Sequence, residues 1–207
     1  DPDNRAPANW EMPPAIDLGL PSGKGWAAFN LGAGTITEYG NYFAWGEIEP
    51  KAIEKFTWSD YKWCKGSKTS LTKYCHDSKF GYNGYSDALA KLEASDDAAS
   101  VLLNSDWSIP SSEDFIELMY NCDYKKGVVN GVGGMIFTSR INGNSVFFPT
   151  GGSVVDGGLR AFGKEGCWWC NDFYNFDVIN GGPYTAFFAF VQEQFDDVFS
   201  PNDGAER

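Results

Sequence analysis

The sequence predicts one mixed α+β domain with short antiparallel strands, one or two docked helices and long irregular loops. Three observations support this fold class. Aromatic residues make up 16% of the 207 residues and glycine occurs 24 times, a composition typical of a β protein whose rings fill the gaps between short strands. One segment has the apolar period of a helix packed on one face, and a later segment has the alternation and turn of a β-hairpin. A chain of this length can bury a substantial core as one domain.

The N-terminal third is expected to be extended and rich in loops. Residues 1–15 are rich in proline and polar residues, which predicts an arm or linker, so the domain is placed at residues 16–207. Aromatic blocks predict short strands over residues 25–31 and 39–47. Residues 48–84 form a long polar stretch, and such a stretch within a domain is either functional or pinned to the core. Its aromatic residues favour pinning and are Phe56, Trp58, Tyr61 and Trp63.

Helical patterns follow in the middle of the chain. Residues 87–93 contain one helical turn or two at most, and Ser95 predicts the cap of a short helix. A longer helix is predicted after Ser111. Asp114 three residues later completes a capping-box pattern, and the acidic residues of the first turn favour the positive helix N-terminus. The apolar stripe of this helix consists of Phe115, Leu118, Met119 and Cys122, at i, i+3, i+4 and i+7.

A β-hairpin is predicted after this helix. Residues 135–140 and 145–150 are rich in β-forming side chains and flank the segment 141–144. That segment contains Asn142-Gly143, and an Asn-Gly pair between two such runs is a strong hairpin signal. The helix and the hairpin together predict one scaffold, with the apolar stripe docked against the sheet.

Charge and hydropathy exclude several classes of partner. The formal net charge is −12 at pH 7, whereas nucleic acids and anionic membranes attract proteins with a basic surface. The sequence contains no apolar run long enough to span a membrane, so we expect no direct membrane insertion of this chain.

The five cysteines leave at least one thiol without a partner in the chain. Cys64 and Cys75 flank a short polar loop. A bridge between them would stabilise the fold by about 3 kcal/mol on the chain-entropy model, and the alternative is two free thiols. Cys122 is expected to be a buried free thiol, because it continues the apolar stripe. Cys167 and Cys170 form a C-x-x-C whose side chains would point to opposite faces of a strand, and their surroundings favour neither a redox nor a zinc site.

Catalytic and metal chemistry find little support in the sequence. His76 is the only histidine and lies in a polar stretch, where it is expected to be solvated. No nucleophile elbow and no P-loop occur. Acidic pairs at 96–97 and 196–197 keep a hydrolase acting through carboxylates as an alternative. No cofactor is expected. Calcium is the alternative, because oxygen ligands without a recognised spacing occur at Asp196, Asp197, Asn202 and Asp203.

A tyrosine- and asparagine-rich segment is the candidate binding site. It follows the Trp pair at 168–169, and such residues combine rigid contact area with hydrogen-bonding groups, as adaptable binding loops do. The alternative is that the segment consists of turns and that one of the two tryptophans belongs to the core. The candidate ligand-binding residues are Trp168, Asn171, Asp172, Tyr174, Asn175 and Asp177.

An ordered set of motifs resembles one bacterial family. The motifs lie at 17–23, 39–47, 73–75, 81–84, 96–99, 107–110 and 142–149, with Trp26 between the first two. In this order and spacing they resemble the Fibrobacter succinogenes major paralogous domain, which is abundant in surface and secreted proteins of gut Bacteroidetes. The resemblance covers the chain from about residue 16 to its end.

This resemblance implies a C-type-lectin-like fold, of the branch that includes the formylglycine-generating enzyme. It implies a protein at the outer surface of a bacterium or outside the cell, often lipid-anchored in its precursor. It also favours the Cys64–Cys75 disulfide, since exported compartments permit disulfides. The family closes with a strand that would begin where the given sequence stops at Arg207, and it has Gly-Tyr-Tyr-Trp-Ser-Ser where this chain has residues 166–171. The cysteine and arginine pattern of that enzyme's active site does not occur here.

Three functions follow as hypotheses. The first is a non-enzymatic, monomeric recognition module that binds a glycan or a host or bacterial surface protein through its C-terminal loops. The second is a structural or adhesin-assembly domain without a small ligand. The third is a glycan-acting hydrolase that uses acidic residues.

Overall fold

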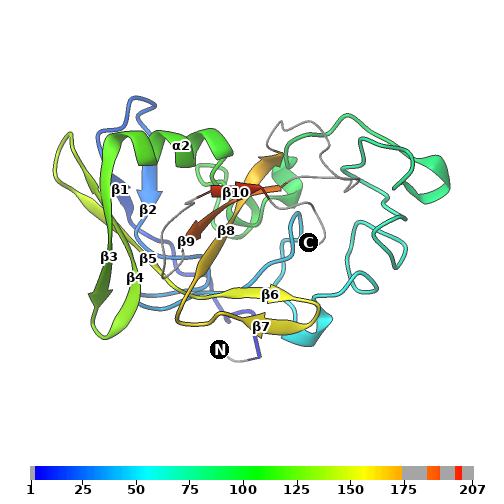
Figure 1. Cartoon of the computed structure of the whole chain (residues 1–207), viewed down its shortest axis with the longest axis horizontal. Coiled ribbons are helices and arrows are strands. Elements are labelled where there is room, and N and C mark those ends of the chain that lie inside the picture. Colours follow the sequence, from blue (N-terminus) through cyan, green and yellow to red (C-terminus); the bar gives the residue numbers. More distant parts are fainter. Residues whose placement is uncertain (1–2, 174–185, 192–198, 202–207) are drawn as a thin grey trace.

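Small antiparallel sheets and two α-helices, joined by long irregular segments, make up the part of the chain that the computed structural model describes (Figure 1). That part comprises residues 3–173, together with the backbone of residues 186–191 and 199–201. The predicted mixture of helices and antiparallel strands is confirmed. The helices are α1 (Ala98–Leu102) and α2 (Ser112–Asn121), with 3₁₀ turns at Ile53–Lys55, Tyr82–Gly84 and Ala94–Asp96. The strands are β1 (Ala15–Asp17), β2 (Gly25–Ala27), β3 (Cys122–Val129), β4 (Val132–Ser139), β5 (Ser145–Pro149), β6 (Ser153–Val155), β7 (Gly158–Arg160), β8 (Gly166–Phe173), β9 (Ala186–Val191) and β10 (Phe199–Pro201).

Helix α2 forms where the sequence predicts it. The hydroxyl of Ser111 accepts a hydrogen bond from the Asp114 backbone N–H at 3.1 Å, and the Asp114 carboxylate accepts one from the Ser111 backbone N–H at 2.8 Å. The predicted capping box is therefore complete. Phe115 and Leu118 are buried in a cluster with residues of β4 and β5, and Met119 packs against it. The docking of the apolar stripe against the sheet is thus confirmed.

The sheet of β3, β4 and β5 contains the predicted hairpin and one strand that the sequence pattern does not predict. β4 pairs with β5 in antiparallel register, with Met135 opposite Phe148. β3 runs from the end of α2 to a turn at Asn130-Gly131, where both residues have positive φ (47° and 83°), as a tight hairpin turn requires. β3 lies at the edge of this sheet and is largely exposed. It contains polar residues such as Lys126, so its sequence lacks the apolar pattern that would predict a strand.

The main core lies between α2, the β3–β4–β5 sheet and the small β1–β2 pair. Trp26 of β2 joins these elements, because its ring centroid lies 5.1 Å from that of Phe115 and 5.9 Å from that of Phe148. Both contacts are edge-to-face, an arrangement that aromatic pairs prefer. Leu18 and Leu118 are fully buried in the same cluster.

Two predicted strands in the N-terminal third differ from the structure. The strand expected over residues 25–31 ends at Ala27, and residues 39–47 contain no strand. Tertiary contacts explain the second difference. Trp45 is 1% exposed, and its indole N–H donates to the carbonyl of Cys170 at 2.7 Å. The aromatic block is therefore an irregular segment packed around a core tryptophan.

The short helical segments before α2 also differ from the prediction. Residues 87–93 contain no helical turn, and a 3₁₀ turn precedes α1 instead. Asp97, not Ser95, caps α1 by accepting a hydrogen bond from the Ser100 backbone N–H at 3.0 Å. Its carboxylate also accepts from the Ile109 N–H at 2.9 Å. One side chain thus serves both the start of α1 and the segment that leads into α2.

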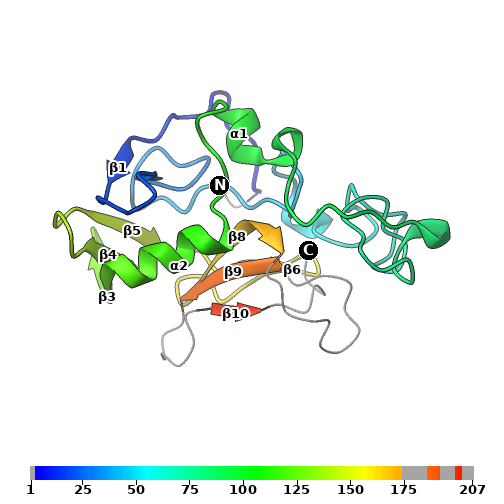
Figure 2. The same cartoon turned by 90° about the horizontal axis from the view of Figure 1, so that it is seen from above.

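The long segment 48–84 is pinned to the core through its aromatic residues, as expected. Phe56 and Tyr61 are buried, and Tyr61 donates its hydroxyl to the carbonyl of Trp45 at 2.9 Å. The segment extends away from the sheets at one end of the molecule (Figure 2, cyan to green). A second hydrophobic cluster around the fully buried Leu71 holds it together.

The N-terminal segment is irregular, as an arm would be, but it is docked. Asn4 is 1% exposed, and its amide nitrogen donates to the carbonyls of Tyr42 and Lys51 at 2.7 and 2.9 Å. Its amide oxygen accepts from the Tyr42 backbone N–H at 2.8 Å and from the side chain of Asn41 at 3.0 Å. This one residue connects the N-terminal segment with residues 41–51.

β8 forms a second sheet with β9 and β10 and passes close to α2 (Figures 1 and 2). Trp168 pairs with Ala189 and Trp169 with Phe188, after which the register shifts before Phe173. Irregularities of this kind re-aim side chains. Because β8 carries half of the predicted binding residues, its course decides which of them can meet a ligand.

Candidate functional site

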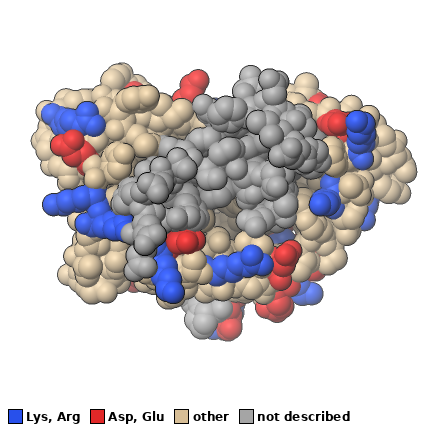
Figure 3. All heavy atoms as spheres, in the orientation of Figure 1, with Lys and Arg blue, Asp and Glu red and all other residues tan. Residues whose placement is uncertain are grey.

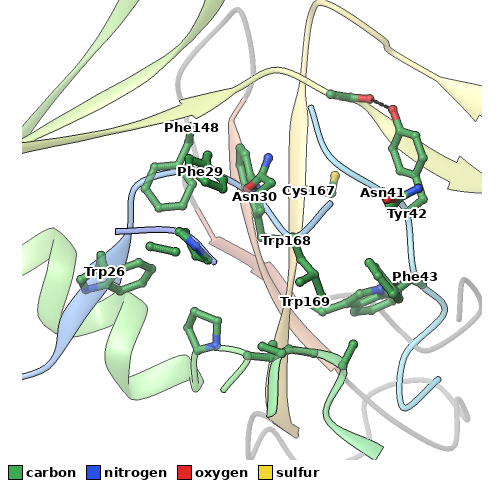
Figure 4. Close-up of a pocket in the computed structure, with 18 of the residues that line it drawn as sticks. Trp26, Phe29, Asn30, Asn41, Tyr42, Phe43, Phe148, Cys167, Trp168 and Trp169 are labelled. Carbon is green, nitrogen blue, oxygen red and sulfur yellow. Dashed lines mark hydrogen bonds between the residues drawn. The ribbon is translucent and has the colours of Figure 1, made fainter. Parts of the chain in front are cut away.

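A pocket of about 520 Å³ lies where four separate segments meet (Figure 4). These are β2 with the residues that follow it, the irregular segment 39–43, β5 and β8, and residues 106–110 complete the wall beside α2. Pockets of this size are ordinary for ligand-binding sites. The segments are far apart in the sequence, so no local motif marks the site.

Aromatic side chains form much of the pocket wall. Figure 4 shows Phe29 and Phe148 toward one end and Phe43 and Trp169 toward the other, with Trp168 between them. The rings of Phe148 and Trp168 meet edge-to-face, with centroids 5.0 Å apart. Phe29, Phe43 and the two tryptophans are only half-buried. The pocket therefore offers aromatic surface to a ligand.

The polar groups of the two tryptophans and of the neighbouring Asn30 are engaged within the protein. The indole N–H of Trp168 donates to Asn30 Oδ1 at 3.1 Å, and Asn30 Nδ2 donates to the carbonyl of Tyr39 at 3.0 Å. The indole N–H of Trp169 donates to the carbonyl of Phe43 at 2.8 Å. What these residues present to the pocket is mainly ring face and carbon.

Tyr42 and Asn41 follow the same rule. Tyr42 donates its hydroxyl to the carbonyl of Gly151, and Asn41 Nδ2 donates to Asn4 Oδ1 at 3.0 Å. Burial, with a smaller contribution from the neighbouring Tyr39, raises the pKa of Tyr42 to about 12. The phenol therefore stays protonated at physiological pH and acts as a fixed donor that positions the pocket wall.

One of the predicted ligand-binding residues, Trp168, lines this pocket. Asn171 and Asp172 do not, because the expected loop continues as strand β8 to Phe173. The remaining three predicted residues lie outside the described residues and are Tyr174, Asn175 and Asp177. Of the three predicted residues that the structure describes, Trp168 is therefore the one that lines the pocket.

Asn171 and Asp172 hold the start of α2 instead. Asn171 is 4% exposed, and its Nδ2 donates to the carbonyl of Ile109 at 2.7 Å. The Asp172 carboxylate accepts from both the backbone N–H and the hydroxyl of Ser112, each at 2.8 Å. A carboxylate is favourable there, because the helix N-terminus carries partial positive charge. These two polar side chains satisfy the backbone where the chain turns into the helix.

Sequence reasoning missed the pocket residues that come from the two aromatic blocks expected to be strands, and four of them combine aromatic and amide side chains. These four are Phe29, Asn30, Asn41 and Phe43. The available signal was the occurrence of an asparagine next to or near a phenylalanine in both blocks. That signal has no period, so it indicates neither a strand nor a site.

The expected Cys64–Cys75 disulfide is not formed in the structure, where both residues are buried thiols. Cys64 Sγ donates to the carbonyl of Trp58 at 2.9 Å, and Cys75 Sγ donates to that of Tyr85 at 3.4 Å. Each thiol thus has a backbone partner of its own. The loop between them is held by backbone pairing of Cys64 with Leu71 instead.

The other three cysteines do not form disulfides either. The prediction for Cys122 is confirmed: it is fully buried, and burial raises the pKa of its thiol. Cys167 lines the pocket, whereas Cys170 is fully buried, and burial raises the pKa of the Cys170 thiol as well. The C-x-x-C is therefore not bridged, as its place in a strand predicts.

The acidic pair at 96–97 has structural roles. Asp96 is 3% exposed, accepts a hydrogen bond from the Tyr74 hydroxyl at 2.7 Å and pairs with Lys73 at 2.6 Å. Asp97 caps α1. The second pair, at 196–197, lies outside the described residues.

Metal-binding side chains do not gather in the described part of the chain. No group of three or more His, Cys, Asp or Glu side chains that could hold a metal ion occurs there. His76 is exposed, as expected, and its ring lies edge-on to that of Phe173. The candidate calcium ligands Asn202 and Asp203 lie outside the described residues.

Acidic and basic side chains are interspersed on the face drawn in Figure 3, without one large patch of a single sign among the described atoms. None of the described helices has the length and apolar character needed to span a lipid bilayer.

Comparison with known proteins gives no match to a family model, to a curated protein or to a solved structure. The function of the pocket is therefore argued from its geometry and from the resemblance of the motifs.

Proposed function

We propose that this chain is a non-catalytic recognition module that binds a surface protein through its aromatic pocket. The ordered motifs support a C-type-lectin-like arrangement and a setting at the outer surface of a bacterium, as in the family that the sequence resembles. We further propose that the monomer is the binding unit. The mixture of small antiparallel sheets, two α-helices and long loops agrees with this class of module.

The observation that carries the proposal is the contrast between open ring faces and engaged polar groups. The indole N–H groups of Trp168 and Trp169 are bonded within the chain, and Phe29 and Phe43 are half-buried rings. These aromatic side chains therefore contribute binding energy chiefly by burying apolar surface, at about 25 cal/mol per Å². Apolar side chains of a protein partner supply such surface, and buried anchors of this kind dominate protein interfaces.

A glycan is the second candidate, because sugar rings stack on aromatic faces. Sugar hydroxyls, however, also require hydrogen-bonding partners. Asn30 already uses both ends of its amide within the chain, and Asn41 uses its amide N–H groups. A protein ligand therefore agrees better with the pocket.

Turnover is not part of the proposal. Glycoside hydrolysis needs two carboxylates that are free to act on one bond. Three acidic residues in the described part of the chain line the pocket. Asp114 pairs with Lys24 at 2.7 Å, and Glu117 accepts two hydrogen bonds from Ser22. These contacts assign two of the three carboxylates to structure, and the one that is left, Asp106, cannot supply a pair.

Binding of the labelled chain to host and bacterial cells tests the proposal. Phe29→Ala removes a half-buried pocket ring that belongs to none of the core clusters. It should weaken binding by at least about fivefold while the melting temperature changes little. Tyr120→Ala is the matched control, since it removes a ring that is 78% exposed and lies outside the pocket. It should bind like the parent.

Treatment of the cells separates the two ligand classes. Loss of binding after protease digestion, with binding retained after periodate oxidation, supports the protein ligand. The reverse pattern replaces it with a glycan. Equal binding by the parent and by Phe29→Ala would show that the recognition site is not this pocket.

A further inference from the structure

The outer edge of β2 faces the pocket, and no described strand other than β1 pairs with β2. The Ala28 N–H donates to the carbonyl of Pro14 at 2.9 Å. This bond shows which opposite residues of the β1–β2 ladder are hydrogen-bonded to each other and which are not. In an antiparallel pair, residues between two hydrogen-bonded positions direct their backbone groups outward. The N–H and C=O groups of Gly25 and Ala27 therefore point away from β1, and both residues line the pocket.

β5 presents a second edge to the same pocket. The Thr150 N–H donates to the carbonyl of Gly133 at 3.0 Å. This bond shows which residues of β5 are hydrogen-bonded to their opposite residues in β4 and which are not. The backbone groups of Phe147 therefore point away from β4, and Phe147 also lines the pocket. Among the described residues, no hydrogen bond reaches these outward groups of Gly25, Ala27 or Phe147.

The opposite edge of the β1–β2 pair is closed. The carbonyl of Asp17 in β1 accepts from Asn142 Nδ2 at 3.0 Å and from Asn144 Nδ2 at 2.7 Å. The turn between β4 and β5 thus covers β1 at Asp17, whereas no segment in the described part of the chain bonds to the β2 edge. An uncovered edge is a template for an added strand.

We propose that the pocket accepts an extended segment of a partner polypeptide, which adds as a strand between β2 and β5. This inference rests on the proposed protein ligand and specifies how that ligand binds. The added strand bonds to β2 on one side and to β5 on the other, and every second side chain enters the aromatic pocket. β2 is 3 residues long, and on the outer edge of β5 the carbonyl of Pro149 is already bonded to the Gly151 N–H, so about three residues of the partner bond to both edges.

Charge selects the flanks of the partner strand. The charged side chains that line the pocket are Lys24, Asp106, Asp114 and Glu117. Lys24 pairs with Asp114, which leaves Asp106 and Glu117 as two negative charges, in a chain whose net charge is −12. Charge complementarity therefore favours a strand whose apolar residues are flanked by lysine or arginine and disfavours acidic flanks.

Selection of a random dodecapeptide phage library on the intact chain supplies the probe. We expect peptides with apolar residues at alternate positions and with basic flanks. The tightest peptide is then synthesised with a single N-methyl group at each backbone amide in turn. Neighbouring amides of an inserted strand bond to opposite edges, so methylation at consecutive central residues should each weaken binding about tenfold. Losses at alternate residues alone would indicate addition to one edge and would overturn insertion.

Two proline substitutions test the protein side with the same peptide. Ala27→Pro removes an N–H from the free edge of β2 without breaking a bond of the β1–β2 ladder, and it should weaken binding about tenfold. Ala15→Pro is the matched control, because it removes an outward N–H from the opposite edge of the same pair. It should leave peptide binding unchanged.

The outcomes separate this inference from the proposed function. Failure to select alternating peptides overturns the inference. If Phe29→Ala abolishes cell binding while N-methylation and Ala27→Pro have no effect, the pocket binds side chains without strand addition, so the inference fails and the proposed function stands. If Phe29→Ala also leaves cell binding unchanged, both fail. The N-methyl series uses the parent protein and does not depend on the folding of any variant.

Discussion

Replacing Asp172 with alanine distinguishes a structural role of the predicted binding segment from a ligand-binding role. The carboxylate accepts two hydrogen bonds from Ser112, both at 2.8 Å, at the N-terminus of α2. Ser112 itself is 4% exposed. The substitution therefore removes both bonds and leaves a buried backbone N–H without its partner.

The size of the loss follows from these contacts. Hydrogen bonds to a charged group contribute about 1.5–3 kcal/mol, and a negative charge at a helix N-terminus contributes about 0.3–1 kcal/mol. Asp172 is only half-buried, so solvent screens part of this interaction, and we expect a loss of about 2 kcal/mol in the free energy of unfolding. In a chain of this size that loss lowers the melting temperature by about 4–8 °C.

Urea denaturation followed by tryptophan fluorescence measures the change. Asp106→Ala is the matched control, because it removes an exposed carboxylate and should stay within about 0.5 kcal/mol of the parent. Asp172→Asn keeps one acceptor oxygen and should fall between the two. If Asp172→Ala is as stable as Asp106→Ala, the bonds to Ser112 do not hold the start of the helix, and the structural role is refuted.

Three further predictions concern the core, the helix cap and the thiols. Leu118→Ala leaves a cavity beneath α2 and should cost about 2–5 kcal/mol in urea denaturation, and a loss below about 0.5 kcal/mol would contradict its docking. Burial opposes ionisation of Asp114, but hydrogen bonds led by that from Lys24 lower its pKa below the usual 3.8. Its stabilisation is therefore present above pH 3.8 and is lost as the pH falls through the lowered value. The stability difference between the parent and Asp114→Asn, about 1 kcal/mol at pH 7, should close on acidification, and a difference that persists at low pH would argue against this ion pair. Because Cys64 and Cys75 are not bridged, dithiothreitol should leave the melting temperature unchanged, and a drop would reveal a disulfide.

Helix α2 and the β4–β5 hairpin could be predicted because their signals are local. The cap of α2 needs only Ser111 and Asp114, which are three residues apart, and the hairpin turn needs only an Asn-Gly pair. The inward face of the helix follows from its period. Such elements require no knowledge of what lies elsewhere in the chain.

Elements that depend on distant contacts could not be predicted in this way. The sequence predicts Trp45 in an aromatic strand, yet the indole N–H of Trp45 donates to the carbonyl of Cys170, which is 125 residues away in the sequence. The pocket also depends on distant contacts, since Trp168 donates its indole N–H to Asn30, which is 138 residues away in the sequence. Periodicity within a window contains no information about such pairs.

The candidate binding segment shows why composition alone does not reveal whether a polar residue serves a ligand or the fold. Asn171 and Asp172 have the chemistry of ligand-binding groups, but the chain uses it to satisfy its own backbone at Ile109 and Ser112. A single sequence does not distinguish the two uses, because both need the same acceptors and donors. The ring of Trp168 lines the pocket while its indole N–H bonds to Asn30, and its role in ligand binding stays a prediction.

The docking of Asn4 determines how far the N-terminus can be shortened without loss of the pocket wall. Without this residue, the N–H and C=O groups of Tyr42 and the carbonyl of Lys51 lose their partners. Arg5 directly after it is exposed, so trypsin can cleave the chain at that point. A single nick there would loosen the pocket wall that Tyr42 and Phe43 form, although no pocket residue is removed. A recombinant version that retains binding must therefore begin before Asn4 rather than near residue 16.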